Sequence, residues 1–266
     1  MTPDLEALIG ARRAHDDLSF EELESRYNFL KTADRRGVLA RLILKEIRRI
    51  RGEGDGPVRA LDIGCGDGIG CEPGYTRAIG AHVDDFWGLE PDPDMLPPEG
   101  VFDQFQHALM ETAELPEGAF DIAYSFMVME HVADPDAFLQ AVSRCLKPGG
   151  VYIFMTPNAW HYFTMTASTL NFLKVDEIVL RILRRSEIDS YHYPVQYKCN
   201  SGKRLRAQAS RAGFSQTGIA YLEAEGPRPY MRGPLRLPFH ALRLKRRIIK
   251  QKSALITLTG RMVKGA

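Results

Sequence analysis

Residues 59–68 of this 266-residue chain, RALDIGCGDG, constrain its fold more than any other segment. They read as an apolar strand that ends in glycines at every second position, Gly64, Gly66 and Gly68. Glycine has no β-carbon, so such a turn lets a ligand approach the backbone where a side chain would block it. The next apolar segment, residues 86–90, ends in an acid, Glu90. This order of strand, glycine turn, helix, strand and acid predicts an α/β fold with a nucleotide-type site at the carboxyl edge of a parallel sheet.

The spacing of the glycines does not fit the fingerprint of dinucleotide-binding proteins. That fingerprint is G-x-G-x-x-G, and its third glycine packs against the following helix. Counted from Gly64, the third glycine would be Ile69; counted from Gly66, it would be Cys71. The chain has G-x-G-x-G instead. Taken alone, this turn is also compatible with a tight strand-to-helix connection that binds no ligand.

Three further segments follow the glycine turn in order. Residues 90–93 (EPDP) put an acid at the end of the second strand, residues 111–121 (ETAELPEGAFD) lead into the fourth, and residues 146–150 (LKPGG) lead into the fifth. With the glycine turn and the EHV of residues 130–132, they resemble the motifs of the class I S-adenosylmethionine (SAM)-dependent methyltransferases. The resemblance is close over residues 58–157 and looser over 200–221. It extends to bacterial members that tailor glycans and secondary metabolites.

This resemblance implies a Rossmann-like sheet of seven mostly parallel strands with helices on both faces. Apolar patterns predict a sixth strand that opens at Phe214, and five earlier strands over residues 58–63, 86–90, 101–107, 120–126 and 150–155. A last strand is predicted over residues 253–259, and in the family this strand inserts antiparallel between the fifth and the sixth. Helices are predicted from Asp34 to Arg51, over residues 201–212, and between the fourth and fifth strands, where Asp134 starts a helix that ends at residues 147–150. Ser19 and Glu22 have the spacing of a capping box, which predicts another helix from Ser19 to about Leu30.

The whole chain, residues 1–266, is expected to form a single domain. We divide it into an N-terminal helical extension (1–56), a SAM-binding core (57–157), an insertion (158–199) and a C-terminal part of the sheet with a basic helix (200–266). The insertion is rich in aromatic residues and histidine, with a helical piece at residues 177–185. Because this fold obtains its acceptor selectivity from such segments, we expect the insertion to be a lid over the acceptor site.

The charge of the chain is unevenly distributed, although the net charge is only +1. No acid follows Glu225, and eleven Lys and Arg residues lie in 226–266. Residues 236–252 have a helical period with apolar and basic faces, which indicates either an ordinary surface helix or contact with an anionic membrane or a phosphorylated acceptor. Nucleic acid is an unlikely partner, since stacking aromatics are sparse in this segment. The four cysteines show no metal-binding spacing, and we expect a cytoplasmic protein without a metal site.

Each part of SAM needs a different partner, and the resemblance suggests one for each. The amino-acid tail and the ribose need the close backbone of the glycine turn, and Asp62 would support the amino group, unless it only caps turn amides. Glu90 would accept hydrogen bonds from both ribose hydroxyls, because a carboxylate has two acceptor oxygens. Glu111 would accept from the adenine amine, with the amide of Thr112 at the ring. The predicted cofactor-binding residues are Asp62, Gly64, Cys65, Gly66, Gly68, Glu90, Pro91, Glu111, Thr112 and Phe126.

The loop after the fourth strand faces the methyl group in this fold. It carries His131, whose imidazole titrates near neutrality and is the candidate general base. The alternative is a positioning or structural role, because methyl transfer to a good nucleophile needs only proximity and alignment. Candidate acceptor contacts, each with lid or core packing as its alternative, are Tyr27, Glu130, His161, Tyr162, His192 and Tyr193.

The sequence therefore predicts a SAM-dependent methyltransferase that acts on a small-molecule or carrier-linked acceptor, most simply by O-methylation. The carrier would be a glycan, a lipid or a secondary-metabolite scaffold. One alternative is a methyltransferase for RNA or protein, which would need a basic groove beside the SAM site; residues 1–225 carry an excess of acids instead. Another is a protein of this fold that binds SAM without turnover and serves as a partner.

Overall fold

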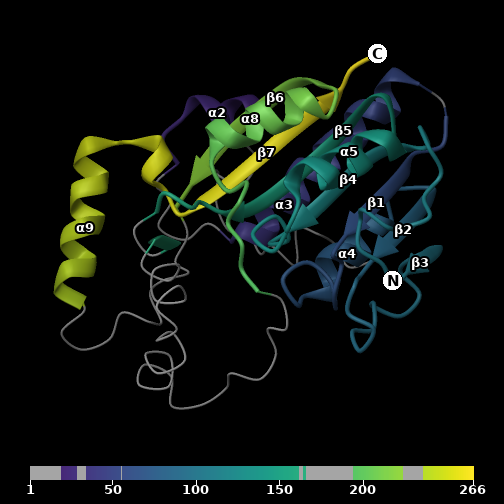
Figure 1. Cartoon of the computed structure of the whole chain (residues 1–266), viewed down its shortest axis with the longest axis horizontal. Helices are drawn as coiled ribbons and strands as arrows, with labels where there is room; N and C mark the ends of the chain where they lie inside the picture. Colours follow the sequence, from purple (N-terminus) through teal and green to yellow (C-terminus); the bar gives the residue numbers. More distant parts are fainter. Residues whose placement is uncertain (1–18, 29–33, 55, 162–163, 166–193, 224–235) are drawn as a thin grey trace.

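A computed structural model of the chain describes residues 19–28, 34–54, 56–161, 164–165, 194–223 and 236–266. These residues contain a seven-stranded sheet with the order β3-β2-β1-β4-β5-β7-β6 (Figure 1). The strands are β1 (Arg59–Ile63), β2 (Asp85–Leu89), β3 (Gln104–Gln106), β4 (Phe120–Phe126), β5 (Leu146–Pro157), β6 (Phe214–Leu222) and β7 (Thr257–Lys264). The first five strands pair in parallel, and β7 runs antiparallel between β5 and β6. The predicted fold class is confirmed.

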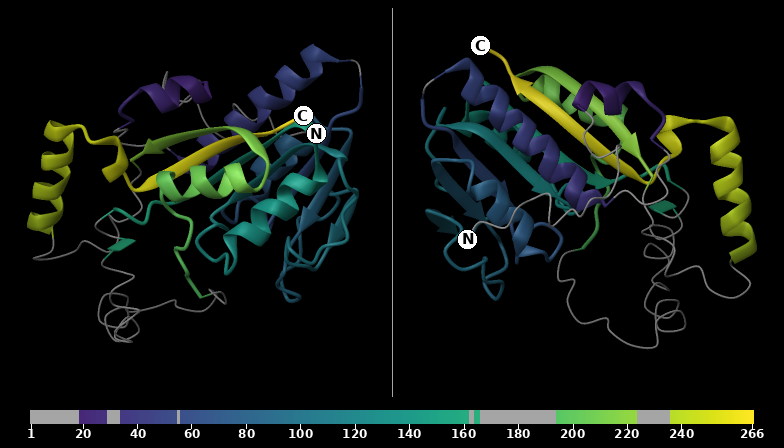
Figure 2. Two further views of the ribbon diagram at one scale, coloured as in Figure 1. Left: turned by 45° about the horizontal axis from the view of Figure 1, so that its top comes forward. Right: turned by 180° about the vertical axis from the view of Figure 1, so that it is seen from behind.

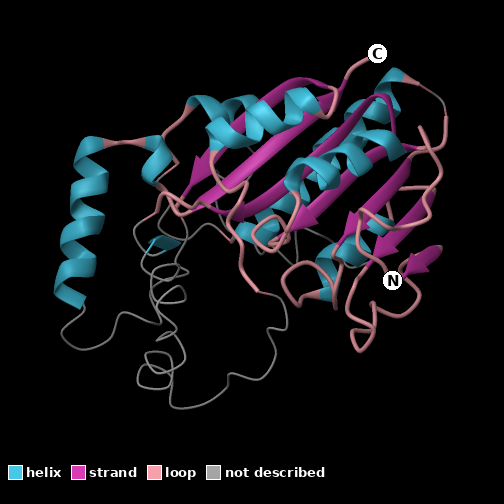
Figure 3. Cartoon of the chain, in the orientation of Figure 1, coloured by secondary structure: helices cyan, strands magenta, loops and turns pink. Residues whose placement is uncertain are grey.

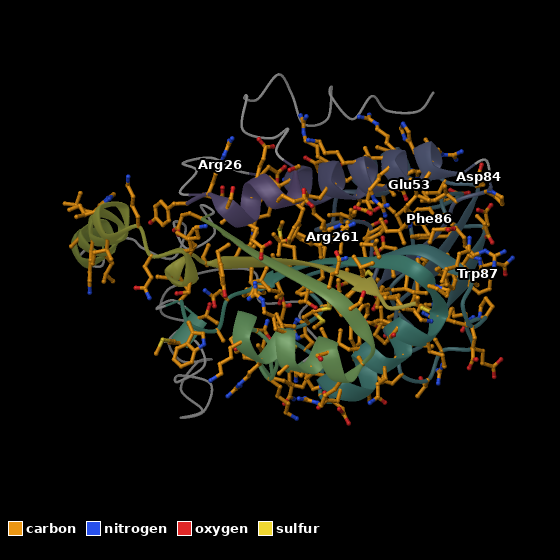
Figure 4. The ribbon with its side chains drawn as sticks, turned by 90° about the horizontal axis from the view of Figure 1, so that it is seen from above. Arg26, Glu53, Asp84, Phe86, Trp87 and Arg261 are labelled. Atoms are coloured by element: carbon orange, nitrogen blue, oxygen red, sulfur yellow. The ribbon has the colours of Figure 1, made fainter. Side chains whose placement is uncertain are left out.

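Helices cover both faces of this sheet, as Figure 3 shows in outline. One face is covered by α3 (Arg35–Glu53) and α4 (Pro73–Gly80), which the rear view of Figure 2 shows crossing the strands, and by the short α2 (Phe20–Ser25). The other face is covered by α5 (Pro135–Cys145) and α8 (Gly202–Arg211). Phe86 and Trp87, labelled in Figure 4, are neighbours on β2 and pack into the cores on opposite faces. This alternation is expected of a strand that is covered on both sides.

Side-chain caps fix where the helices begin. Ser19 and Glu22 form the predicted capping box at α2, each accepting from the other's backbone N–H. The Asp34 carboxylate accepts from the Arg36 amide at the start of α3, and Asp134 caps α5 in the same way. These caps satisfy amide groups that have no partner within their own helix.

A buried ion pair joins α3 to the last strand. The guanidinium of Arg261, labelled in Figure 4, donates to both carboxylate oxygens of Glu46, at 3.0 and 2.9 Å, and Arg49 donates to the same carboxylate. Burial alone would raise the pKa of Glu46, but the two guanidinium groups outweigh burial and hold it below its usual value. The pair therefore fastens β7 to α3 only while Glu46 is ionised.

Several predicted boundaries were wrong. Helix α2 ends at Ser25 rather than near Leu30, because the backbone is extended at Arg26 and the Lys252 ammonium binds the last carbonyls of the helix, those of Glu24 and Ser25. The last strand runs over Thr257–Lys264 rather than over residues 253–259. Ahead of it, residues 252–254 form a 3₁₀ turn, and the Asn158 amide binds the carbonyls of Ser253 and Leu255. Strand β3 is shorter than predicted, and β5 is longer at both ends.

The basic segment forms the helix α9 (Arg236–Ile249), which stands apart from the sheet in Figures 1 and 2. The predicted helical piece at residues 177–185 lies outside the described residues. None of the described helices is long and apolar enough to cross a bilayer.

Candidate functional site

The glycine turn after β1 has one open position. All three glycines have positive φ, +67° at Gly64, +47° at Gly66 and +94° at Gly68. A β-carbon at Gly64 would lie 2.5 Å from a methyl group of Val128, and one at Gly68 would lie 2.7 Å from the Cα of Pro73. Among the described residues, a β-carbon at Gly66 would meet only a carboxylate oxygen of Glu90, at 3.9 Å. The first and third glycines are therefore required by packing, whereas the space beside Gly66 is free for a ligand.

Glu90 places its carboxylate at this open position. It follows β2, whose Leu89 carbonyl accepts from the amides of Gly64 and Cys65 at 2.7 and 2.9 Å, so the two strand ends are bound together. Oε2 of Glu90 accepts from the Gly66 amide at 2.9 Å, and Oε1 accepts from the Asp92 amide at 3.0 Å. Each oxygen keeps a second lone pair, so the carboxylate can still accept from a diol such as a ribose.

We expect Glu90→Ala to weaken SAM binding about ten- to a hundredfold. A hydrogen bond to a charged group contributes about 1.5–3 kcal/mol, and the variant also frees the Gly66 amide. Calorimetric titration with S-adenosylhomocysteine measures the change. The exposed acid Glu117 supplies the control, because Glu117→Ala removes an equal charge far from the turn. Equal affinity in wild type and a folded Glu90→Ala would remove Glu90 from the ribose site.

Asp62 lies beneath the turn, at the end of β1. Its side chain is buried, and Oδ2 accepts from the Tyr124 hydroxyl at 2.9 Å. Burial raises the pKa of Asp62 to about 8, the Tyr124 hydrogen bond opposes this rise, and the nearby charge of Glu90 adds to it. The carboxyl group therefore keeps its proton at neutral pH in this structure. A cationic group such as an ammonium would favour the ionised form.

This shifted pKa predicts a pH-dependent stability. Between about pH 4 and pH 8 the unfolded chain ionises Asp62 while the folded chain keeps the proton, so this group lowers the free energy of unfolding as the pH rises. Asp62→Asn cannot ionise, and its stability relative to wild type should rise by more than about 1 kcal/mol from pH 5 to pH 8. Urea unfolding at both pH values measures the difference. The exposed Asp94 provides the control variant Asp94→Asn, and equal pH slopes for all three proteins would contradict the prediction.

The loop after β4 lies one strand away from the glycine turn, because β4 pairs with β1 up to Ser125 and Ile63. Met127 begins the loop with φ at +56°, and its amide donates to the Met155 carbonyl at 2.8 Å. A side chain in this backbone region is strained and persists only where its surroundings hold it. The loop brings His131 to the carboxyl edge, where its Nδ1 lies 3.4 Å from the Pro194 carbonyl.

Other predicted site residues lie in different surroundings. Glu130 and His161 are buried, and burial raises the pKa of Glu130 to about 7. The burial of His161 favours its packing alternative. Tyr27 is half-buried and follows α2 rather than lying on it. Tyr162, His192 and Tyr193 lie outside the described residues.

Of the two residues predicted to contact the adenine, Thr112 differs in one detail from the prediction. The Thr112 amide donates to the Leu109 carbonyl at 3.0 Å within a turn, so it is not directed at an adenine ring in this structure. Glu111 is half-buried beside it. Their roles at the adenine stay predictions.

Arg36 was not predicted, yet it lies against the glycine-rich segment. A β-carbon at Gly70 would be 2.8 Å from the Cδ of Arg36 and 3.0 Å from the ring of Phe126. Asp34 and the ring of Tyr75 hold the guanidinium in place. A cation here can pair with a carboxylate, such as that of an amino-acid tail. The sequence offered only a weak signal, two arginines after a helix cap.

The comparisons with known proteins agree with this geometry. The family model described as "Methyltransferase domain" matches residues 33–217. A ubiquinone biosynthesis O-methyltransferase of Maricaulis maris is 38% identical over 106 residues, which is 38% of this chain and 41% of that protein. The enzyme of the same name from a Bradyrhizobium species is 36% identical over 115 residues, 41% of this chain and 44% of its own length. The chain thus spans less than half the length of these curated relatives.

Solved structures share the fold at low identity. A chain from the complex of the Haloferax volcanii Trm112 methyltransferase activator with a methyltransferase aligns with a TM-score of 0.52 and 16% identity, covering 79% of this chain and 83% of that chain. Phosphoethanolamine N-methyltransferase 2 of Haemonchus contortus, solved with SAM, aligns with a TM-score of 0.50 and 14% identity, covering 84% and 53%. At such identities the likeness concerns the fold.

Proposed function

The chain belongs to the methyltransferase-domain family, with SAM as its cofactor, and from this premise we propose that it transfers a methyl group to an oxygen of a small-molecule or carrier-linked acceptor. The observation that carries the proposal is the open position at Gly66 beside the Glu90 carboxylate. Packing requires glycine at positions 64 and 68, whereas the described residues leave free space beside Gly66, where we propose that the ribose lies. The residues present therefore fit the cofactor.

In the proposed site, SAM supplies an electrophilic methyl group, and the residues of the chain hold it and the acceptor. Glu90 binds the ribose, Asp62 supports the amino group, and Arg36 can pair with the carboxylate. His131 accepts the proton of an acceptor hydroxyl, which makes the oxygen a better nucleophile. A proton on Nδ1 directed at the Pro194 carbonyl would leave Nε2 as the basic nitrogen. Nε2 is enclosed in this structure, so the loop after β4 has to expose it before it can reach the acceptor.

Oxygen is the favoured acceptor atom because the curated relatives are named as O-methyltransferases. We test the proposal in two steps. Calorimetry with S-adenosylhomocysteine measures cofactor binding, and radiolabelled SAM is then supplied with panels of phenols, sugar alcohols and amines, with RNA and with protein. Label in a hydroxyl compound supports the proposal. Label only in RNA or protein favours the alternative enzyme, and binding without transfer to any panel favours the non-catalytic partner.

We further propose that the chain contacts anionic membranes through residues 236–252. Four apolar side chains of α9 are exposed, Leu242 at 36%, Leu244 at 57%, Ile248 at 71% and Ile249 at 56%. The exposure of Leu244 and Ile248 is evidence against the alternative, in which Leu237, Leu244 and Ile248 pack against the domain. Residues 242–250 also carry five basic residues, Arg243, Lys245, Arg246, Arg247 and Lys250, and a helix that combines apolar and basic residues in this way is typical of one that lies on a lipid surface.

This contact predicts salt-sensitive flotation with vesicles. Each basic residue near an anionic surface contributes about 1 kcal/mol, screened within a Debye length of about 8 Å. The protein should float with phosphatidylglycerol vesicles at low salt, and neither at high salt nor with neutral vesicles. Ile248→Ser should reduce flotation, whereas Leu96→Ser, which changes an equally exposed side chain elsewhere, should not. Absence of flotation at low salt would contradict the proposal.

A further inference from the structure

We propose that Glu130 is a positioning residue: through Thr156 and Asn200 it holds residues 194–201 against the loop after β4, and thereby sets the position of His131. This inference rests on the proposed function, in which His131 faces the acceptor hydroxyl. Glu130 itself is buried, so it acts through its neighbours rather than by touching the acceptor.

A buried chain of hydrogen bonds connects the three residues. The Thr156 hydroxyl donates to Oε2 of Glu130 at 2.8 Å. The Asn200 amide donates to the Thr156 oxygen at 2.6 Å and to the Pro157 carbonyl at 3.1 Å. Thr156 and Asn200 are fully buried. Thr156 is the middle member of this series of hydrogen bonds. Its hydroxyl therefore joins the end of β5 to the loop after β4 on one side and to residues 194–201 on the other.

The backbone of Glu130 binds the same segment a second time. Its carbonyl accepts from the amides of Gln196 and Tyr197, at 2.7 and 3.1 Å. Tyr197 has φ at +48°, a backbone region that a tyrosine adopts only under constraint. Cys199 adds a bond from its thiol to the Met129 carbonyl at 3.1 Å. Residues 194–201 are thus fixed to the loop on both sides of Glu130.

This attachment bears directly on His131. The segment begins at Pro194, whose carbonyl lies 3.4 Å from Nδ1 of His131, and His131 follows Glu130 in the chain. Joining two segments through a buried carboxyl group costs free energy, because burial without a full counter-charge is unfavourable. Glu46 shows the contrast, since two guanidinium groups bind its buried carboxylate, whereas at Glu130 burial outweighs the charge of Arg35 and raises the pKa. We infer that the polar connection is kept for its directionality, which an apolar contact lacks.

The test removes the central hydroxyl. Thr156→Val keeps the shape of the side chain but breaks both bonds, and Thr156→Ser keeps the hydroxyl. The matched control is Thr259→Val, which changes another fully buried strand threonine, one whose hydroxyl donates to the Phe154 carbonyl at 2.8 Å. We expect Thr156→Val to lower kcat about tenfold with the affinity for S-adenosylhomocysteine unchanged, because displacement of a catalytic group slows the chemical step. Thr156→Ser should restore kcat, and Thr259→Val should lower only the Tm.

A second readout needs no acceptor. The imidazole ¹⁵N signals of His131 report its tautomer and surroundings, and Thr156→Val should shift them while Thr259→Val should not. Unchanged kcat and unchanged His131 signals in a folded Thr156→Val would overturn the inference. If wild type transfers no methyl group to any acceptor, the proposed function fails, and the His131 signals still decide whether Glu130 positions this residue through Thr156.

Discussion

Replacement of Gly66 by valine should abolish SAM binding while most of the fold persists. Of the part of the chain that the structure describes, only Oε2 of Glu90 would lie within 4 Å of the β-carbon at this position, at 3.9 Å, so these residues do not clash with it. The φ of +47° costs a β-branched residue about 1–2 kcal/mol, a strain that a domain of this size can tolerate. The added methyl groups would occupy the volume proposed for the ligand. We expect the affinity for S-adenosylhomocysteine to fall by more than about a hundredfold.

Gly118 offers a matched control for this experiment. It has φ at +57°, no residue that the structure describes lies within 4 Å of its missing β-carbon, and it precedes β4 at the opposite edge of the sheet. Gly118→Val therefore adds a similar backbone strain without approaching the site. Calorimetry and thermal unfolding on both variants separate strain from ligand exclusion. Wild-type affinity in Gly66→Val would show that the cofactor binds elsewhere.

The sequence was sufficient to predict those features of the fold and the site that depend on residues close together in the chain. The three glycines and Glu90 belong to one strand–turn–helix–strand unit, so their spacing predicted that they meet at one edge of the sheet, whereas the role of Asp62 came from the family resemblance. The capping box of Ser19 and the caps at Asp34 and Asp134 are equally local, and they marked the starts of their helices correctly. The position of the last strand between β5 and β6 came instead from the family resemblance.

The sequence was insufficient where residues distant in the chain determine where an element ends or which groups meet. Helix α2 ends where Lys252 reaches its carbonyls, and β7 begins only after Asn158 has bound two carbonyls ahead of it. The contact of Arg36 with Gly70 and Phe126 likewise joins separate parts of the chain. The Thr112 amide was predicted at the adenine, but a turn with Leu109 already uses it. Periodicity and spacing carry no information about such partners.

The carboxyl edge of the sheet brings together two carboxyl groups, those of Asp62 and Glu130, whose pKa values are raised by burial. Burial raises the pKa of Asp62 to about 8 and that of Glu130 to about 7, while Glu90 binds two backbone amides. A cationic ligand would lower the cost of a negative charge at Asp62, so cofactor binding should be coupled to proton release there. The His131 side chain is half-buried with its Nε2 enclosed, so we expect it to exchange a proton with an acceptor only once that nitrogen is exposed.

We expect His131→Asn to slow the chemical step about a hundredfold or more at saturating SAM, if the acceptor is a hydroxyl. Asparagine keeps a polar side chain of similar reach but cannot accept the proton, so binding should change little while kcat falls. Single-turnover transfer from radiolabelled SAM measures the step directly. His82→Asn is the control, since His82 is exposed between α4 and β2, at the amino edge of the sheet. A decrease of less than about threefold would assign His131 a positioning or structural role, because a general base contributes much more than that to a proton transfer.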